Sequence, residues 1–336
     1  MSKDKISVLV KMSAAEQIEY IKSAMGYKVL AKPPKYWLDT GSRYLNKVFG
    51  SKRLGMAYGK IYLLAGKPSS GKSALAAKLA ALAQADGASV GWGDPENSFD
   101  PKHVAHQGLD AGDEVRNRAG DLLGYEKVAL FKVEYGTFSR KVKDKSKTKK
   151  VIFEDRPETA EELCTRIEAW MKIRRKIDLE GKVCVVIDSI TTLSPEEELV
   201  AGLTDQNMRT RSSPAVFLNL LSKRWIALAE NTNAIIILIA QLRTNPKTLY
   251  GNPDYVPGGN GILYNPSSVV WMRRVKGGEI LRHGRQVGTK GVLTNHKNKV
   301  GGGSIERKKS GYKALFYKDA WEFMDPKEVE KDKEIE

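Results

Sequence analysis

The residues best suited to chemistry lie in the segment Gly66-Lys-Pro-Ser-Ser-Gly-Lys72-Ser73. This segment fits the pattern G-x-x-x-x-G-K-[ST] at every fixed position, between an apolar run and an alanine-rich run. The glycines let backbone N–H groups face phosphate oxygens, and a helix that begins here adds its dipole. Lys72 would neutralise the β- and γ-phosphates, and the Ser73 hydroxyl would ligate Mg²⁺. The pattern predicts a site for ATP and Mg²⁺.

Polar side chains follow three further apolar runs. Asp188 ends the run VCVVID, where a carboxylate suits Mg²⁺, although it could instead cap the following turn. Asp94, Glu96 and Asp100 follow another run, and any of the three could polarise the attacking water. Gln241 ends the third run, where its amide could hydrogen-bond a γ-phosphate.

Short apolar runs and amphipathic helices alternate along the part of the chain that positions these residues. Strands are expected at residues 60–65, 88–93, 128–133, 183–187 and 234–240. Helices are expected at 72–85, 157–177 and 214–230. This alternation predicts an α/β fold with a mostly parallel central sheet flanked by helices. After Ser268 the sequence is rich in strand patterns, which predicts antiparallel strands that extend the sheet toward the C-terminus.

Three regions are expected from the composition along the chain. Residues 1–50 form a small N-terminal region with a helix from the capping box at Ser13 to about Met25. Residues 51–322 form the core, with a basic insertion near 136–152. Residues 323–336 form a charged tail that is predicted to be disordered.

The composition favours a polyanionic partner. The 336 residues include 56 Lys and Arg against 40 Asp and Glu, a formal net charge of +16. Nucleic acid is one such partner, and a basic enzyme without one is the alternative. The chain has no apolar run long enough for a membrane span, and its first residues do not resemble a secretory signal. Cys164 and Cys184 are expected to be reduced core residues, so we expect a cytoplasmic protein that does not bind membranes.

Two segments could contact nucleic acid. Lysines occur at every second position from 141 to 149, so a single strand or a hairpin arm would place all five on one face, although a solvated loop is equally consistent. The segment 244–267 combines basic, aromatic and glycine residues. Such a loop beside a nucleotide site is typical of a nucleic-acid loop gated by ligand.

The order of these motifs resembles that of the bacterial RecA family and its phage relatives, over roughly residues 39–318. The chain has Thr40-Gly-Ser42, the doubled serine at 69–70, Asp94-x-Glu96-x-x-x-Asp100-Pro and Asp188-Ser189. It then has Gln241-x-Arg243, Gly251-Asn-Pro253, Gly258-Gly-Asn260 and Lys297-Asn-Lys299. The resemblance implies a RecA-like P-loop core and a DNA-dependent ATPase. It implies homologous recombination by a helical homo-oligomeric filament on single-stranded DNA, which pairs with duplex DNA and exchanges strands.

The resemblance also assigns roles to residues. Glu96 would be the general base and Gln241 the γ-phosphate sensor, with Lys72 as the third catalytic residue. Lys297 and Lys299 would reach the ATP of the neighbouring subunit, and the N-terminal region would join subunits. The remaining nucleotide contacts would be Gly66, Ser69, Ser70, Gly71, Ser73, Ala74, Asp100, His103 and Asp188. DNA contacts would come from two loops and one further residue. Met208, Arg209 and Arg211 would lie in the first loop. The second loop, at 244–265, would contribute in or beside it Arg243, Tyr250, Gly258, Gly259 and Asn260, and Lys223 would be a further contact.

The chain departs from the family pattern in several places. His103 stands where the family usually has a tyrosine, and little sequence after Lys318 remains for the family's C-terminal domain. This compact build favours a phage or plasmid recombinase. Two alternatives stay open: a hexameric helicase motor with the same core, and a recombinase paralogue or mediator that does not exchange strands.

Overall fold

The structure is a computed structural model. It describes Ser13 and residues 33–51, 53–120, 122–143, 149–201, 207–246, 253–300, 312–317 and 321–324. The chain divides into two units, Met1–Lys35 and Tyr36–Glu336. The helix expected from Ser13 to Met25 lies outside the described residues, apart from Ser13 itself, as do residues 325–336 of the expected tail.

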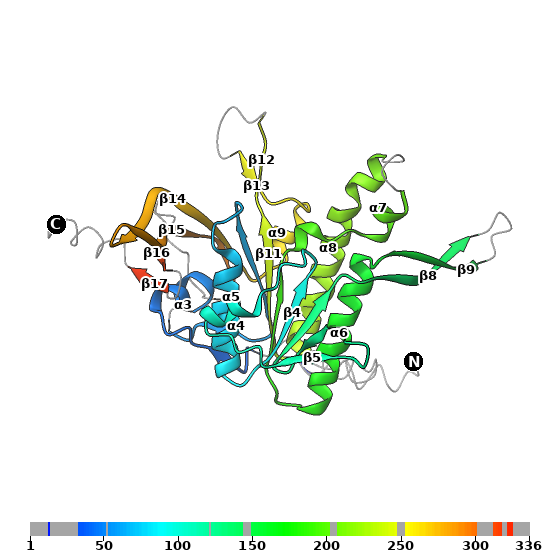
Figure 1. Cartoon of the computed structure of the whole chain (residues 1–336), viewed down its shortest axis with the longest axis horizontal. Coiled ribbons are helices and arrows are strands. Elements are labelled where there is room, and N and C mark those ends of the chain that lie inside the picture. The colour runs from blue at the N-terminus through cyan, green and yellow to red at the C-terminus, as the bar shows by residue number, and fades with distance from the viewer. Residues whose placement is uncertain are drawn as a thin grey trace. The chain divides into compact units, whose positions relative to one another are not determined.

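A nine-stranded sheet runs through the larger unit in the order β17-β16-β15-β14-β3-β11-β10-β4-β7. Neighbouring strands from β14 to β7 are parallel, whereas β14, β15, β16 and β17 pair antiparallel. The prediction of a mostly parallel sheet with an antiparallel extension is therefore confirmed (Figure 1). The strands are β3 (Lys60–Gly66), β4 (Ser89–Asp94), β7 (Val128–Lys132), β10 (Val183–Ile187), β11 (Ala234–Gln241), β14 (Ser268–Arg282), β15 (Arg285–Asn298), β16 (Tyr312–Tyr317) and β17 (Trp321–Met324).

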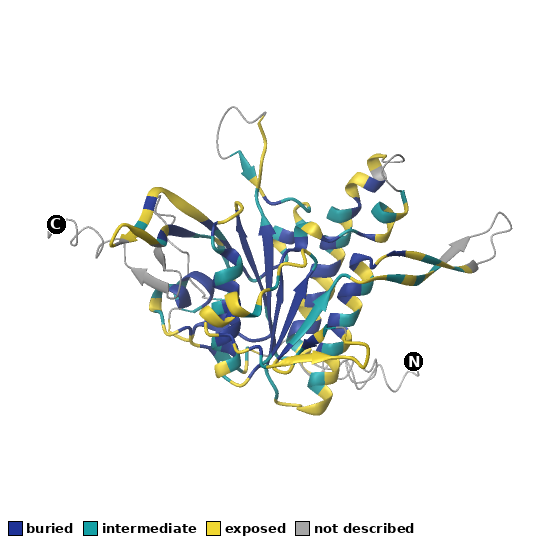
Figure 2. Cartoon of the chain, viewed as in Figure 1, coloured by how far each residue is buried: buried dark blue, intermediate teal, exposed yellow. Residues whose placement is uncertain are grey.

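Helices cover both faces of the sheet, because successive side chains of a buried parallel strand point to opposite faces. Ile237 of β11 belongs to the apolar cluster that contains Leu79 of α4. Its neighbour Leu238 belongs to the cluster that contains Leu163 of α6 and Trp225 of α8. The buried strands between these helices are visible in Figure 2. The helices are α3 (Arg43–Phe49), α4 (Lys72–Ala85), α5 (Pro101–His106), α6 (Ala160–Ile177), α7 (Glu196–Ala201), α8 (Met208–Asn231) and α9 (Gly261–Tyr264), with a 3₁₀ turn η1 (Ile190–Thr192).

Helix α8 begins six residues earlier than the sequence predicts, at Met208 instead of Pro214. Proline lacks the N–H that would bond the carbonyl four residues back. Here the Ser213 hydroxyl donates to that carbonyl, the Thr210 oxygen, at 2.9 Å. The Asn207 side chain accepts from Thr210 N at 3.1 Å and so satisfies an N–H group of the first turn. The expectation that Met208, Arg209 and Arg211 lie in a loop is therefore wrong.

Four two-stranded ribbons complete the described secondary structure. They are β1 (Trp37–Leu38) with β2 (Met56–Ala57), β5 (Glu114–Arg116) with β6 (Leu122–Tyr125), β8 (Tyr135–Lys143) with β9 (Lys149–Pro157), and β12 (Arg243–Thr244) with β13 (Asp254–Tyr255). The lysine-rich segment is not one strand, because Lys141 and Lys143 lie on β8 and Lys149 lies on β9, which pairs antiparallel with it. Lys145 and Lys147 lie outside the described residues. No described helix is long and apolar enough to cross a membrane.

Both cysteines lie in the core, as expected. Cys164 of α6 and Cys184 of β10 are buried and do not form a disulfide. Burial raises the pKa of each thiol.

Candidate nucleotide site and its surroundings

The phosphate-binding pattern forms a tight loop between β3 and α4. Ser69 and Gly71 both adopt positive φ, 58° and 90°. A side chain at Gly66 would not fit, because a Cβ atom there would come within 2.4 Å of the Ser70 hydroxyl oxygen and 2.6 Å of the Met272 carbonyl oxygen. Gly71 is the N-cap of the 14-residue helix α4, with no side-chain cap and no acidic residue in the first turn. The first N–H groups of α4 are thus oriented for an anion.

Lys72 lies inside this loop. Its ammonium group donates to the Lys67 carbonyl oxygen at 2.8 Å and lies 3.5 Å from the Ser70 hydroxyl oxygen. Burial lowers the pKa of Lys72, while the nearby carboxylates Asp188 and Glu96 act in the opposite direction. The ammonium is therefore poorly hydrated, which strengthens its attraction for phosphate.

Asp188 follows β10 and faces Ser73 of α4. Burial raises the pKa of Asp188 to about 6, and the Ser73 hydroxyl opposes that rise by hydrogen bonding to the carboxylate. The carboxylates of Glu96 and Asp94 raise it further. The described residues contain no group of three His, Cys, Asp or Glu side chains that could hold a metal alone. The Ser73 hydroxyl and the Asp188 carboxylate would suit Mg²⁺ that takes its remaining ligands from phosphate and water.

Of the three acids after β4, two have local structural partners. The Asp94 carboxylate is fully buried and accepts from the backbone N–H groups of Ser98 and Phe99, both at 2.9 Å. Asp100 caps α5 and accepts from Lys102 N at 2.9 Å. Both carboxylates therefore hold the local backbone in place.

Glu96 makes different contacts. Its Oε1 accepts from the Ser189 hydroxyl at 2.6 Å and from the Gln241 amide Nε2 at 3.1 Å. These partners follow β10 and end β11, which are neighbouring parallel strands. Three strand ends therefore bring Glu96, Ser189 and Gln241 together beside the P-loop.

Thr191 joins this cluster and was missed in the sequence. Its hydroxyl oxygen lies 2.9 Å from that of Ser189, and the backbone N–H of Gln241 points to it at 3.5 Å. The signal available was the run of hydroxyl residues after Asp188, Ser-Ile-Thr-Thr. That run has no fixed meaning without knowledge of the neighbouring strand.

The remaining nucleotide candidates lie at different distances along the chain from the P-loop. Ala74 lies in the first turn of α4, directly after Ser73. His103 is an exposed residue of α5. Lys299 is exposed, and its backbone N–H donates to the Ser267 carbonyl oxygen at 2.8 Å.

Lys297 caps the end of α9 within its own subunit. Its ammonium group donates to the carbonyl oxygens of Leu263 at 3.2 Å and Pro266 at 2.7 Å, and also to that of Tyr264. Burial and the neighbouring Lys299 lower the pKa of Lys297 to about 8. A cation at a helix C-terminus is stabilising, which gives this lysine a structural role that sequence reasoning did not identify.

The first group of DNA candidates lies on α8. Met208 is 85% exposed, and Arg211 is also exposed in the first turn. Arg209 belongs to the same turn. Lys223 is exposed but follows Met208 by fifteen residues, about 22 Å along a helix. The structure therefore does not bring Lys223 together with the first three.

The second group follows Gln241. Arg243 is exposed on β12 opposite Tyr255 of β13, and Tyr250 lies outside the described residues. Gly258 has a φ of 104°, and a Cβ atom there would come within 2.4 Å of Leu218 Cδ1 of α8. A Cβ atom on Gly259 would lie 3.2 Å from that of Ala215. The glycine pair, followed by Asn260 as the N-cap of α9, therefore has a packing reason that is independent of DNA.

An ion pair connects the P-loop with this second group. The Lys67 ammonium lies 3.1 Å from an Asp254 carboxylate oxygen of β13. The Thr244 hydroxyl donates to the same carboxylate at 2.7 Å, and these two contacts, the Thr244 bond first, lower the pKa of Asp254. Neither Lys67 nor Asp254 was singled out in the sequence, because position 67 is variable in the motif.

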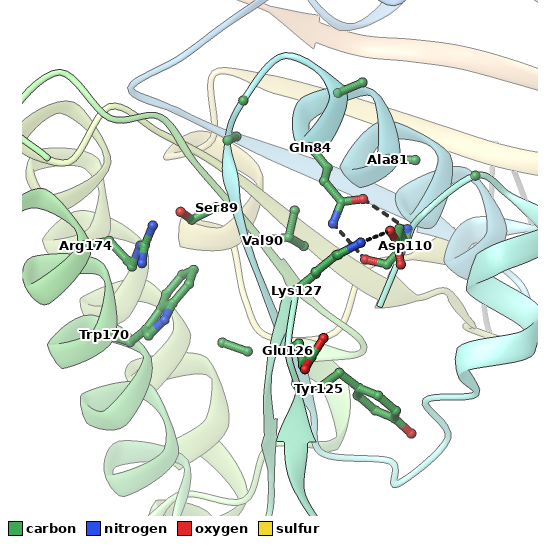
Figure 3. A pocket seen from close by; sticks show the side chains of 15 residues that line it. Ala81, Gln84, Ser89, Val90, Asp110, Tyr125, Glu126, Lys127, Trp170 and Arg174 are labelled. Atoms are coloured by element: carbon green, nitrogen blue, oxygen red, sulfur yellow. Dashed lines mark hydrogen bonds and ion pairs between the residues drawn. The ribbon is translucent and has the colours of Figure 1, made fainter. Parts of the chain in front are cut away.

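A separate cavity of about 640 Å³ lies at the opposite edge of the sheet, around the amino ends of β4 and β7. Figure 3 shows Trp170 and Arg174 of α6 on one side of it and the Asp110–Lys127 ion pair on the other. Nucleotides bind at the carboxyl ends of parallel strands. This cavity therefore lies away from the strand ends that form the candidate nucleotide site.

Known sequences provide the comparison. The RecA N-terminal domain family matches residues 154–310, a stretch that follows the P-loop and contains Asp188, Gln241 and Lys297. Protein RecA of Ureaplasma parvum serovar 3 is 28% identical over 267 residues, which cover 78% of this chain and 64% of that protein. Protein RecA of Anaplasma marginale is 24% identical over 238 residues, 71% of this chain and 53% of that protein.

The chain thus spans between half and two-thirds of the length of these curated relatives. The match begins at residue 154 and includes two of the strand ends that build the site, those of β10 and β11. The order of motifs around it, the parallel sheet and the P-loop geometry agree with that match. Together they show that the chain is similar to proteins of the RecA family.

Proposed function

We propose that this protein is a DNA-dependent ATPase that forms helical filaments on single-stranded DNA and promotes homologous pairing and strand exchange. The observation that carries the proposal is the contact between Glu96 and Gln241, at 3.1 Å. Glu96 is the most suitable general base beside the P-loop, and Gln241 is the residue from which the candidate DNA segment starts. The contact joins the two. A nucleotide-dependent change at Gln241 would therefore reach DNA directly.

The proposed nucleotide chemistry divides among four side chains. The N–H groups of the loop and α4 and the Lys72 ammonium would hold the phosphates of ATP. The Ser73 hydroxyl and the Asp188 carboxylate would hold Mg²⁺, which neutralises charge on the phosphates. Glu96 would accept a proton from the attacking water, since its hydrogen bonds with Ser189 and Gln241 fix its orientation.

The proposed link to DNA starts at Gln241. Its Nε2 group donates to Glu96, and the same amide could turn to a γ-phosphate oxygen. Leu242, the next residue, donates its backbone N–H to the Gly66 carbonyl oxygen at 3.0 Å. The chain leaving β11 is therefore attached to the P-loop before it reaches Arg243. Arg243 and Tyr255 lie opposite each other on β12 and β13, where a cation and an aromatic ring would suit single-stranded DNA.

The proposed assembly places ATP between subunits, with Lys297 and Lys299 reaching across. This role requires Lys297 to exchange its carbonyl partners in α9 for phosphate. Lys299 is already exposed beside it. In mixing experiments, a Lys297→Ala protein combined with a Glu96→Gln protein should regain part of the DNA-stimulated turnover. No gain at any ratio, in mixtures shown to co-assemble, would argue against a shared site.

The main test measures ATP hydrolysis with and without single-stranded DNA. The wild type should turn over faster with DNA, whereas Glu96→Gln should bind ATP normally and lose about 10²- to 10⁴-fold in turnover. Glu126→Gln, at an exposed carboxylate, is the matched control and should behave as the wild type. Turnover that is insensitive to Glu96→Gln would remove Glu96 as the base and would contradict the proposed chemistry.

Electron microscopy of the protein with single-stranded DNA and an ATP analogue distinguishes the architectures. Open helical filaments support the recombinase. Closed rings would indicate a helicase motor. Filaments that fail to exchange strands between a circular single strand and a homologous linear duplex would indicate a paralogue or mediator.

A further inference from the structure

The ribbon of β8 and β9 extends away from the sheet and helices (Figure 1). Each strand has nine residues, about 30 Å at the usual strand rise. Among the described elements, no other helix or strand packs extensively against either strand. A ribbon that does not pack on the core cannot be explained as a contribution to that core.

The root of the ribbon is firmly attached to α6. Arg156 of β9 is buried and donates to both carboxylate oxygens of Glu162, at 2.8 and 2.9 Å. Glu162 belongs to the capping box of α6. Arg166 of α6 donates to Glu158 just after β9, at 2.7 and 2.6 Å, and to Glu134 just before β8, at 2.7 Å. Both strands are therefore held where they leave the core.

The two faces of the ribbon differ. On one face, the Arg140 guanidinium lies 2.8 Å from a Glu154 oxygen, and Arg156 lies 4.9 Å from the centre of the Phe138 ring. The side chains of that face therefore satisfy one another. The opposite face exposes Tyr135 by 73%, Phe153 by 72% and Val151 by 48%. Val151 and Phe153 are next neighbours on this face, and the Thr137–Asp155 pair separates them from Tyr135. Large exposed apolar side chains on one face usually mark a contact surface.

The ribbon is also strongly basic. Residues 135–157 contain eight Lys and Arg against three Asp and Glu. Two of those acids are used inside the ribbon, since Glu154 pairs with Arg140 and Asp155 accepts from the Thr137 hydroxyl at 2.6 Å. The register places Lys143 directly opposite Lys149.

We propose that the ribbon of β8 and β9 binds duplex DNA, with its strand lysines on phosphates and the Tyr135–Val151–Phe153 face against base edges. The major groove admits a two-stranded ribbon of this kind, and apolar side chains contact the thymine methyl group there. A rigid root suits a ribbon that must enter a groove. The inference rests on the proposed function only in that DNA is the ligand, because it assigns a site separate from the P-loop and from the segment after Gln241.

The test uses the full chain and measures binding to a fluorescent 30-base-pair duplex and to one of its strands over a salt series. Tyr135→Ser with Phe153→Ser should weaken duplex binding several-fold. Lys141→Gln with Lys143→Gln should weaken it and should make the logarithmic salt dependence shallower by about 2, one unit for each phosphate contact. Binding to the single strand should be unchanged in both variants.

Matched controls change the same residue types elsewhere. Leu123→Ser with Leu179→Ser alters two side chains that are 61% and 69% exposed. Lys172→Gln with Lys176→Gln removes two exposed charges of α6. Both controls should bind duplex as the wild type does. Equal losses on duplex and single strand, or no loss on either, would overturn the inference. A wild type that does not bind single strands would instead contradict the proposed function, whatever the ribbon does.

Discussion

Carboxylates at the candidate nucleotide site and at the ribbon root have opposite environments. Asp188 is buried without a hydrogen-bonded cation, and burial raises its pKa to about 6. Glu162, at the ribbon root, accepts a bidentate hydrogen bond from Arg156, which holds its pKa below the ordinary value. The carboxylate of Asp188 therefore has no cation hydrogen-bonded to it in the described part of the chain, whereas the carboxylate of Glu162 is neutralised by Arg156.

The difference separates a site for a ligand from a structural joint. A carboxylate that is costly to ionise gains most when a cation arrives, so Asp188 is suited to Mg²⁺. A carboxylate that is already paired with arginine gains little from binding a ligand, and breaking the pair lowers the stability of the protein. Substitutions at the candidate nucleotide site should therefore affect ligand binding more than stability. Substitutions at the ribbon root should affect stability more than ligand binding.

The largest effect is expected from Lys72→Ala. It removes the ammonium that would face the phosphates, so ATP binding should be lost and hydrolysis should fall by about 10²- to 10³-fold or more. Isothermal titration with ATP and Mg²⁺ measures the binding. Lys78→Ala is the matched control, because Lys78 lies on the same helix six residues further on and should leave binding unchanged. Unchanged binding in the Lys72 variant would show that this loop is not the phosphate site.

The second prediction concerns pH. Folding favours protonated Asp188, so its contribution to stability is full below pH 4 and is lost as the pH rises through about 6. The loss is on the order of 3 kcal/mol. Asp188→Asn should remove this dependence, so its free energy of unfolding relative to wild type should increase between pH 4 and pH 8.

Urea denaturation across this pH range measures the effect, with Asp113→Asn, an exposed aspartate, as the control. The affinity of the wild type for ATP with Mg²⁺ should rise through pH 6, as Asp188 ionises. A constant difference between wild type and Asp188→Asn would mean that Asp188 is not costly to ionise.

The parallel core could be predicted closely from sequence because its signals are local. The predicted helix at 72–85 has the observed bounds, and strand 183–187 matches as well. Apolar runs and a glycine-rich loop determine these elements without distant partners. The start of α8 could not be predicted, because the Ser213 hydroxyl compensates for the missing N–H of Pro214.

The choice among the three acids could not be made from sequence either. Asp94, Glu96 and Asp100 have equal claims by spacing alone. Their difference depends on backbone N–H groups in the loop and on Ser189 and Gln241, which are 93 and 145 residues away from Glu96. In the same way, the capping role of Lys297 depends on α9, more than thirty residues away. These are tertiary contacts that no local pattern contains.

The third prediction concerns the ribbon root. Glu162→Gln should destabilise the protein by about 1–2 kcal/mol at pH 7, because it weakens a charged hydrogen bond in a partly exposed pair. Since the pKa of Glu162 is lowered in the folded state, this contribution is present at neutral pH and is lost as the pH falls below about 4. ATP turnover should stay unchanged. Urea denaturation at pH 7 and pH 3 measures the effect, with Glu126→Gln as the control.

The smallest effect is expected at the ion pair between Lys67 and Asp254, the contact that joins the P-loop to β13. The pair is partly exposed, with side-chain exposures of 56% and 21%, so Lys67→Ala and Asp254→Ala should each change the free energy of unfolding by less than about 1 kcal/mol.

A double-mutant cycle for ATP affinity provides the sharper measurement. Loss of either partner should change ATP affinity two- to threefold, and the double variant should show no additional change, because the Lys67–Asp254 ion pair is absent in all three cases. Arg116→Ala and Glu114→Ala remove another exposed pair, 2.6 Å apart, and should leave ATP affinity unaltered. Additive effects of Lys67→Ala and Asp254→Ala would mean that the two residues act independently. Among the described residues, the coupling between the candidate nucleotide site and the segment after Gln241 would then run through Gln241 and Leu242.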